Sequence, residues 1–371
     1  MNQSVANVPR YRVTMNGTIL EGVVQVSAMP PIAFQVGKFR IVKAFVPDDA
    51  FPASWWAATA NKTMLISIEM AVDGVTFHPM ITGNVDSHKY DAIGNTITAV
   101  GRDLAAGMLD TRIVTTYRNK TSSEIAAMFA AEHSLKTNIT PTPNFVGRYY
   151  DTDHDETNSG NFSPATNEWD LLCRLGDREG IIPYVFGTTL YFNPPADNPP
   201  MFPVSLTRDS YGLLVANVIG LDLTRNMTAA RDVVVTVRSW HSRQKTTFSA
   251  TVRTKTKDAS TDATLPPSKY LRTIPNLTQA QCLAMAKKYA LDISQHERNA
   301  SISIPSLALM DPQTVIPLSG TGTDYDMTFY PLTISYDIDF KSGASTTVQA
   351  KFSSPLFLYD DDTGEQIREQ S

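Results

Sequence analysis

Cysteine is scarce in this sequence of 371 residues, and long apolar runs are missing. Cys173 and Cys282 are too few and too far apart for a disulfide framework or a zinc cluster, and we expect both to be reduced and buried. No apolar stretch approaches the roughly 18 residues that a membrane-spanning helix needs. Residues 1–10 lack the charged and then apolar regions of a secretory signal. The sequence therefore predicts a soluble, non-secreted protein without stable membrane association.

Charge is also sparse. Charged residues make up 19% of the chain, below the roughly 25% that is usual, and the net charge is −5. This balance argues against a protein that coats nucleic acid and leaves only local basic patches to consider. At roughly 150 residues per domain, the length indicates two or three packed units. Threonine is abundant, and because β-branched side chains suit a pleated surface, we expect a strand-rich fold.

The common catalytic motifs are missing as well. The sequence has no Walker-type phosphate loop, no Gly-x-Ser-x-Gly nucleophile elbow and no paired-histidine zinc helix. Gly320 and Gly322 lack the third glycine and the strand-then-helix context of a dinucleotide fingerprint, so we interpret them as a turn. We therefore expect a protein that is not an enzyme and has no catalytic, cofactor-binding or metal-binding residues.

Alternation of apolar and other residues predicts strands in the first hundred residues. Within residues 64–72, apolar side chains recur at every second position, at Ile66, Ile68, Met70 and Val72. Further strands are expected at residues 11–15, 22–27 and 96–100. Residues 48–60, which contain Trp55 and Trp56, fit either a short helix or a loop that packs on this sheet.

Helical signals begin after Gly101. Residues 103–109 are helix-prone, and Thr121 with Glu124 matches a capping box, so we expect a helix from there to about residue 133. Residues 167–178 predict a second helix that ends at Gly180, followed by a hairpin of residues 184–186 and 190–192. Prolines cluster between residues 194 and 203. Because proline removes donors from a strand ladder, the cluster predicts a domain edge near residue 200.

The last third returns to strands around one helix. Alternating valines that lead to Trp240, with a return strand at 248–252, predict a long antiparallel hairpin. A helix is expected at residues 277–294. Two closing strands follow, the first with Ile334, Tyr336, Ile338 and Phe340 on one face and the second with Thr346, Val348, Ala350 and Phe352. The polar residues 359–371 are expected to be a mobile tail.

Two polar segments are candidates for chemistry. Asp151-Thr152-Asp153-His154-Asp155 offers oxygen ligands and a candidate base, but positions six and twelve lack the glycine and glutamate of a calcium loop. We favour a polar loop or strand end. The second segment is the basic stretch around the long hairpin, with Arg238, His241, Arg243, Lys245, Arg253, Lys255 and Lys257. Such a ribbon could contact phosphates, yet a solvated or protein-binding face suits this acidic chain better.

The tryptophans do not form a stacking platform. Trp55, Trp56, Trp169 and Trp240 lie on different expected elements without close spacing. We therefore favour packing in a core or an interface for all of them.

Between residues 101 and 200 the sequence contains several short motifs in a defined order. They include Gly101-Arg102-Asp103-Leu104, Leu109-Asp110-Thr111-Arg112, Tyr117-Arg118-Asn119-Lys120-Thr121-Ser122, Gly147-Arg148-Tyr149-Tyr150, Asn167-Glu168-Trp169-Asp170-Leu171-Leu172 and Arg178-Glu179-Gly180. With Ala284-Met285-Ala286-Lys287-Lys288 and the turn Gly343-Ala344-Ser345-Thr346-Thr347, they resemble the late control protein D family of phage tail hub proteins. The hub portion of type VI secretion spike proteins is similar. The resemblance covers most of the chain.

The resemblance implies a mainly β fold with an α+β insertion. In this family two tandem β-barrels flank an inserted α/β domain, and a helix lies within the second barrel region. Carried over, the first barrel spans residues 1–100 and is completed by residues 201–228, and the insertion spans residues 101–200. The second barrel spans residues 229–358 with its helix at 277–294, and the polar tail is residues 359–371.

The resemblance also implies a structural function. Hub proteins of this family form a homotrimeric ring with six-fold-like symmetry that joins the hexameric tail tube to the trimeric central spike. Tube protein, spike protein, and also baseplate wedge and tape-measure proteins are the implied partners, and DNA only passes through the channel. No cofactor is implied. The implied location is the tail baseplate of a virion, assembled in the host bacterial cytoplasm.

Other functions stay open at this point. The first is the hub of a phage-derived contractile injection particle. A second, from another class, is a metal-dependent hydrolase that uses Asp151 to Asp155. A third is a carbohydrate- or DNA-binding β protein that uses the hairpin with Trp240.

Overall fold

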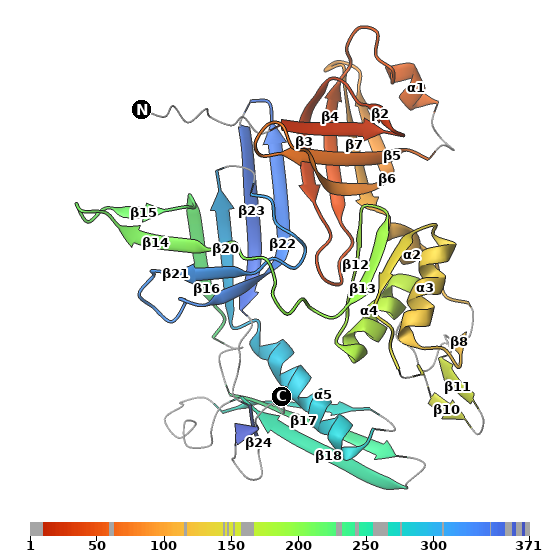
Figure 1. The fold of residues 1–371 in the computed structure, drawn as a ribbon, viewed down its shortest axis with the longest axis vertical. Coiled ribbons are helices and arrows are strands. Elements are labelled where there is room, and N and C mark those ends of the chain that lie inside the picture. The colour runs from red at the N-terminus through yellow and green to blue at the C-terminus, as the bar shows by residue number, and fades with distance from the viewer. Residues whose placement is uncertain are drawn as a thin grey trace. The chain divides into compact units, whose positions relative to one another are not determined.

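The structure is a computed structural model of the 371-residue chain, shown in Figure 1. It describes residues 10–58, 63–114, 117–143, 145–146, 148–150, 153–156, 167–227, 232–241, 245–254, 266–274, 277–305, 308–341, 343–352, 358–360 and 366–367. Strands predominate, so the prediction of a mainly β fold is confirmed. None of the helices in these ranges is both long and apolar enough to span a membrane.

The chain divides into two compact units. The first comprises Met1–Phe202, Ser303–Thr314 and Leu332–Val348, and the second comprises Pro203–Ile302, Val315–Pro331 and Gln349–Ser371. Strands β20 (Arg298–Ile304), β22 (Thr328–Asp339) and β23 (Gly343–Phe352) contribute residues to both. The expected division into two barrels and an insertion stays a prediction.

Antiparallel strands build the sheet of the first unit. Their hydrogen-bonded order is β3, β4, β7, β6, β5, β1 and β2, and the carboxyl half of β22 pairs with β3. Their bounds are β1 Arg10–Met15, β2 Thr18–Ile19, β3 Val23–Met29, β4 Lys38–Ala44, β5 Leu65–Ala71, β6 His78–Asp91 and β7 Thr96–Asp103. Each strand expected from the sequence in this region is therefore present.

Strand β5 shows why the alternation predicts a strand. Ile66, Ile68 and Met70 are fully buried, whereas Ser67 and Glu69 between them are partly exposed. Successive side chains of a strand point to opposite faces, so one face of β5 lies in the core.

Near β5 the structure corrects one prediction and decides another. Val72 was expected on the buried face but is exposed, because the strand ends at Ala71 and the alternation ends with it. The segment that fitted either a helix or a loop contains a short helix, α1 (Ala53–Ala57). Trp56 of this helix is buried, and its ring nitrogen donates to the carbonyl of Phe51 at 3.2 Å.

Residues 104–193 of the first unit form a helical and β region around its own core. Its elements are α2 Ala106–Asp110, β8 Tyr117–Arg118, α3 Ser122–Glu132, β9 Lys136–Ile139, β10 Arg148–Tyr150, β11 Asp153–Glu156, α4 Glu168–Glu179, β12 Ile182–Phe186 and β13 Thr189–Asn193. Helices α3 and α4 pack beside the sheet β12-β13-β9 (Figure 1), with Phe129, Leu172, Leu175 and Phe192 fully buried. The predicted hairpin corresponds to β12 and β13.

The ends of α3 and α4 follow from the sequence. The Thr121 hydroxyl accepts from the Glu124 amide at 3.3 Å, and the Glu124 carboxylate accepts from the Thr121 amide at 2.9 Å. The capping box is therefore confirmed. Helix α4 ends at Gly180, whose φ of +69° lies in the left-handed region that glycine adopts without strain.

Short strands of the second unit pair around β21. Strand β14 pairs with β15 and β21, β21 pairs with the first residues of β22, and β16 pairs with β20, which also pairs with β23. The bounds are β14 Val204–Arg208, β15 Leu214–Ala216, β16 Gly220–Arg225, β20 Arg298–Ile304 and β21 Ile316–Ser319.

A helix packs on a separate sheet of the second unit. The strand order is β19-β17-β18-β24-β25, with β17 Val233–His241, β18 Thr246–Arg253, β19 Ser268–Thr273, β24 Leu358–Asp360 and β25 Gln366–Ile367. Helix α5 (Gln279–Ser294) buries Cys282, Ala286 and Ala290 against valines of β17 and β18. The long hairpin and this helix were both predicted. Within the expected tail of residues 359–371, only backbone pairing of β24 and β25 is described.

Two apolar side chains are more exposed than predicted. Ile334, Tyr336 and Ile338 are buried as expected, but Phe340 is 88% exposed because β22 ends at Asp339. Both cysteines are free. Cys282 is buried, whereas Cys173 is only half-buried, since it lies at the edge of the apolar face of α4.

Candidate functional site

The acidic segment at residues 151–155 lies partly in a described strand. In the backbone register of β10 and β11, His154 is opposite Tyr149. Asp151, Thr152 and the side chains of β11 lie outside the described residues. Among the side chains that are described, no group of three or more His, Cys, Asp or Glu residues could hold a metal ion. The hydrolase alternative stays a prediction.

The hairpin of β17 and β18 carries part of the expected basic face. Arg238 and Lys245 are exposed, but Arg253 is buried in an ion pair with the buried Asp232. The inclusion of Arg253 in a solvated face is wrong, because Asp232 supplies the opposite charge that allows the guanidinium to be buried. The other expected members lie outside the described side chains, namely His241, Arg243, Lys255 and Lys257.

The tryptophans divide between core and surface. Trp56 and Trp169 are buried, which confirms a packing role for these two. Trp240 is exposed on β17, next to the buried Ser239. Trp55 is half-buried and packs edge-to-face against Trp56.

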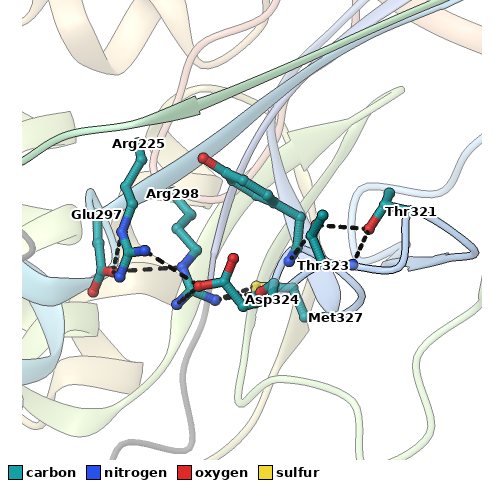
Figure 2. Close-up of polar contacts among 8 residues, drawn as sticks. Arg225, Glu297, Arg298, Thr321, Thr323, Asp324 and Met327 are labelled. Atoms are coloured by element: carbon teal, nitrogen blue, oxygen red, sulfur yellow. Dashed lines mark hydrogen bonds and ion pairs between the residues drawn. The ribbon is translucent and has the colours of Figure 1, made fainter.

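A cluster of charged side chains in the second unit connects three chain segments, as Figure 2 shows. Arg225 ends β16, Glu297 and Arg298 lie at the start of β20, and Asp324 follows β21. Arg225 contacts Glu297 Oε1 at 2.7 Å and Asp324 Oδ2 at 3.2 Å. Arg298 Nη2 contacts Asp324 Oδ2 at 2.8 Å, and its Nη1 donates to the Asp324 carbonyl at 2.5 Å. The cluster therefore fastens the segment after β21 to β16 and β20.

Two aromatic rings lie near Arg298 of the cluster. The guanidinium of Arg298 lies 5.9 Å from the ring centre of Tyr325 and 5.5 Å from that of Phe352. Rings at such distances attract a cation and shield it from water. Each of the cationic groups already faces a carboxylate within the cluster, so the arrangement suits a structural clasp better than a phosphate or metal site.

The turn at Gly320 and Gly322 adjoins this clasp. Asp326 Oδ1 accepts from the Thr321 hydroxyl at 2.7 Å and from its amide at 2.9 Å, and Oδ2 accepts from the Gly322 amide at 3.1 Å. These bonds, that of the hydroxyl foremost, lower the pKa of Asp326. Gly320 has a φ of +90°, and a Cβ there would lie 1.9 Å from the carbonyl oxygen of Leu206. The interpretation as a turn is confirmed, and its glycine allows a close approach to β14.

The motif Gly101-Arg102-Asp103-Leu104 has a physical explanation in the first unit. Arg102 at the end of β7 donates to both carboxylate oxygens of Asp86 at 2.7 and 3.0 Å. It also donates to both oxygens of Asp110 in α2 at 3.1 and 2.8 Å. Its hydrogen bonds to Asp86 foremost, and then to Asp110, raise the pKa of Arg102. The arginine thus ties the sheet to the start of the helical region.

Asp103 also connects the sheet to the start of the helical region, through a buried carboxylate. It is buried and accepts from the amides of Gly37 at 2.6 Å and Ala105 at 2.9 Å. Burial raises its pKa to about 7, against the opposing effect of the two amides. The helix expected from residue 103 begins at Ala106, because Asp103 still belongs to β7.

Apolar side chains gather on the hairpin of β14 and β15. Tyr211, Leu213, Leu214 and Val215 are all exposed within five residues. Exposed apolar residues are common on protein surfaces, and only large contiguous patches of them mark interaction sites.

The capping box of α5 and the turn between β14 and β15 had local sequence signals, whereas the charged cluster had none. Thr278 and Gln281 form a second capping box, at the start of α5, that the spacing of the two residues could have predicted. Asp209 and Gly212 in the tight turn between β14 and β15 are typical turn residues. The members of the charged cluster come from segments far apart in the sequence, so no local pattern could have predicted it.

Comparisons with known proteins identify the fold. No protein-family model and no curated protein sequence matches this chain. Among solved structures, a tail protein from Neisseria meningitidis MC58 matches with a TM-score of 0.67 and 16% identity over 93% of this chain and 97% of that chain. The 43 kDa tail protein of prophage MuSo2 from Shewanella oneidensis matches with a TM-score of 0.62 and 14% identity, covering 92% and 97% of the two chains.

A type VI secretion component has a similar structure. The Escherichia coli c3393 protein, which exhibits structural similarity to the T4 bacteriophage tail proteins gp27 and gp5, matches with a TM-score of 0.53 and 10% identity. The match covers 96% of this chain and 79% of that one. At these identities the likeness establishes the fold. The chain therefore has the fold that the motif resemblance implied, that of tail and type VI spike-associated proteins.

Proposed function

We propose that the chain is a structural subunit of a phage tail baseplate hub. The observation that carries the proposal is the extent of the likeness to the Neisseria tail protein, which spans nearly the whole of both chains. A shared fold alone does not define a function. The order of motifs between residues 101 and 200 supports the same role independently.

In the proposed hub, three copies form a ring in which two similar β-barrels per subunit create six-fold-like symmetry. Residues 1–100 with 201–228 form the first barrel, residues 101–200 the insertion, and residues 229–358 the second barrel. The ring joins the hexameric tail tube to the trimeric central spike, and wedge and tape-measure proteins are further partners. Assembly in the host cytoplasm and a final place in the virion baseplate follow from this role.

The proposed subunit acts by assembly and not by catalysis. DNA passes through the channel without stable binding, and the net charge of −5 suits a channel to which DNA does not adhere. A strongly positive inner surface of the ring would contradict this part of the proposal.

A closely related function is the hub of a phage-derived contractile injection particle. The likeness to the Escherichia coli type VI component supports it. The two functions differ in cargo, because only a phage particle packages DNA. Purified particles that contain this chain and package DNA would favour the phage hub, and particles without DNA would favour the injection device.

Size-exclusion chromatography with light scattering tests the proposed ring. We expect a species of three times the 40.8 kDa chain mass that persists on dilution. Negative-stain electron microscopy of this species should show a three-fold ring with an open centre. A chain that stays monomeric at all concentrations, or a closed particle without a central opening, would overturn the proposal.

A further inference from the structure

A histidine and a glutamate join two helices of the first unit. His133 directly follows α3, and Glu168 is the first residue of α4. Nε2 of His133 and Oε2 of Glu168 are 2.6 Å apart, and the two side chains are only 19% and 5% exposed. The pair therefore connects the end of one helix to the start of another at a site that water barely reaches.

Helix α2 completes this site. A Cβ on Gly107 of α2 would lie 2.7 Å from Nδ1 of His133, so the glycine leaves the room that the imidazole occupies. The carbonyl of Thr111, which caps the C-terminus of α2, accepts from the Glu168 amide at 3.1 Å. Helices α2, α3 and α4 thus meet at the His133–Glu168 pair.

The two helix ends favour opposite charges on the pair. The C-terminal end of a helix attracts a cation, and the N-terminal end attracts an anion. His133 caps the C-terminus of α3, and Glu168 opens α4. A protonated imidazole beside an ionised carboxylate matches both helix ends and makes a charge-assisted hydrogen bond between them.

Two further titratable groups act on the pair. Burial foremost raises the pKa of Glu168, the hydrogen bond with His133 opposes this effect, and the like charge of Glu132 at the end of α3 adds to it. Burial, and then both carboxylates, raise the pKa of Tyr117 in β8 to about 12, so this hydroxyl is neutral and supplies no charge. Among the described side chains, the positive charge next to Glu168 therefore comes from His133.

Other carboxylates at these helix ends have partners of their own. Asp110 of α2 accepts from Arg102 at 3.1 and 2.8 Å. Asp170 in the first turn of α4 accepts from the side-chain amide of Asn167 at 2.8 Å. Both carboxylates are thus engaged outside the His133–Glu168 pair.

We propose that the His133–Glu168 pair is a pH-sensitive latch on the contact of α2, α3 and α4. While the pair holds its proton, opposite charges keep the helix ends together. Loss of the proton leaves a nearly buried Glu168 carboxylate beside that of Glu132, opposite a neutral imidazole. Because a buried charge without its counterion is destabilising, the helix ends separate more often as the pH rises. All groups of the latch belong to one chain, so it does not depend on the proposed hub.

The direction of the pH effect follows from proton binding. The pKa of Glu168 in the folded chain lies above its ordinary value of 4.5, so the folded chain holds this proton more tightly than the unfolded chain. Stability from this group is fully present below pH 4.5 and is lost as the pH rises. One proton changes an opening equilibrium by at most about tenfold per pH unit.

Hydrogen exchange of single backbone amides in the full chain tests the latch. The bonded amides of His133 and Glu168 report on the joined helix ends. The amide of Ile181, which donates to the Gly176 carbonyl at 2.8 Å at the other end of α4, is the internal reference. After correction for the intrinsic pH dependence of exchange, we expect the protection of the first two amides to fall at least tenfold from pH 5 to pH 8 relative to Ile181. No such fall would contradict the latch.

The same substitution at two glutamates separates the latch from ordinary fraying of helix ends. Glu168→Gln removes the buried carboxylate, so the protection of the His133 amide should differ less than threefold between pH 5 and pH 8. Glu21→Gln is the matched control, because Glu21 is exposed in the first unit, and it should leave the tenfold fall in place. A fall that persists in Glu168→Gln would assign the pH effect to another group and overturn the latch.

Asp103 requires its own control because it loses a proton in the same pH range. Its carboxylate accepts from the Ala105 amide next to α2, and its pKa is about 7. In Asp103→Asn the fall in protection at Glu168 and His133 should still be at least tenfold. If the fall disappears in this variant, Asp103 and not the His133–Glu168 pair causes it.

A second variant leaves every titratable group in place. The Cβ of Gly107→Ala would lie 2.7 Å from Nδ1 of His133 and so displaces the imidazole from Glu168. We expect the protection of the Glu168 amide at pH 5 to fall at least fivefold relative to Ile181, with circular dichroism as the check of folding. Unchanged protection at pH 5 in the folded variant would show that the imidazole does not hold the helix ends, even if Glu168→Gln fails to fold.

Discussion

Charged side chains are placed differently in the two units. In the first unit, Lys43 of β4 and Asp49 form an ion pair in which the side chains are 0% and 4% exposed. In the second unit, Asp324 is 54% exposed where Arg225 and Arg298 contact it. Both the attraction between charges and the cost of removing them from water are larger in a dry interior. The buried pair therefore constrains the fold around it, whereas the cluster, whose acceptor Asp324 is half-exposed, fastens a segment at a smaller energetic cost.

Apolar side chains show the same contrast. Strand β5 of the first unit buries Ile66, Ile68 and Met70 completely, whereas β15 of the second buries none of its residues. Both strands belong to one continuous run of paired strands, in which β15 is the terminal strand next to β14. Position within the run therefore decides burial: β5 pairs on both sides, with β1 and β6, whereas β15 pairs with β14 alone among the described strands.

Removal of the Lys43 ammonium group tests how strongly the buried ion pair stabilises the first unit. We expect Lys43→Met to lower the free energy of unfolding by about 3–5 kcal/mol, because the Asp49 carboxylate stays buried without its partner. Urea denaturation measures the loss. The additional change Asp49→Asn should recover part of it, since an amide keeps an acceptor for the Phe51 amide without a charge.

The same substitution elsewhere in β4 provides the control. Lys38 is exposed, so Lys38→Met should change the free energy of unfolding by no more than about 0.5 kcal/mol. If Lys43→Met and Lys38→Met lowered the free energy of unfolding equally, burial of the Lys43–Asp49 pair would not explain the loss.

Asp103 predicts a pH dependence in the first unit. Its pKa of about 7 in the folded chain exceeds the ordinary value of 3.8, so the folded state holds this proton more tightly than the unfolded state. Stability from this group is fully present below pH 4 and is lost as the pH rises to about 7, by roughly 1 kcal/mol per pH unit. Asp103→Asn should remove that slope, as urea denaturation between pH 4 and 8 would show.

The comparison at pH 4 separates ionisation from hydrogen bonding. At that pH the wild-type Asp103 is neutral in the folded state, and the difference from Asp103→Asn reports mainly the acceptor lost to Gly37 or Ala105. If wild type and variant have parallel stability curves from pH 4 to 7, the carboxyl is ionised throughout and the raised pKa is wrong.

Local sequence patterns predicted the helices and the strands with clear alternation, but many shorter strands, such as β14 to β16 and β19 to β21, were not predicted. Alternation at Ile66, Ile68 and Met70, and the capping box at Thr121 and Glu124, act through neighbouring residues, so the chain itself carries the information. The same local reasoning was wrong at Phe340, because the alternation does not show where a strand ends. Strand pairing across long sequence separations had no local signal.

The candidate sites were less predictable because they depend on long-range contacts. Nothing near Arg225 in the sequence indicates that Asp324 will face it, and nothing near Arg253 indicates that Asp232 will pair with it. The run from Tyr211 to Val215 was visible in the sequence, but it resembles a core strand until burial is known. Whether such a run is buried depends on distant parts of the chain, and no local pattern shows that.

Substitution in the half-exposed cluster should change the free energy of unfolding least, in contrast to substitution of Lys43. We expect Asp324→Asn to lower the free energy of unfolding by less than about 1 kcal/mol, because water reaches the half-exposed Asp324 carboxylate and the Asp324 carbonyl still accepts from Arg298. Its effect should shrink further in about 1 M salt, where the screening length falls to about 3 Å, whereas the effect of Lys43→Met should persist. Urea denaturation at low and high salt measures both. A loss for Asp324→Asn as large as that for Lys43→Met, unchanged by salt, would show that the clasp is as dry as the buried pair.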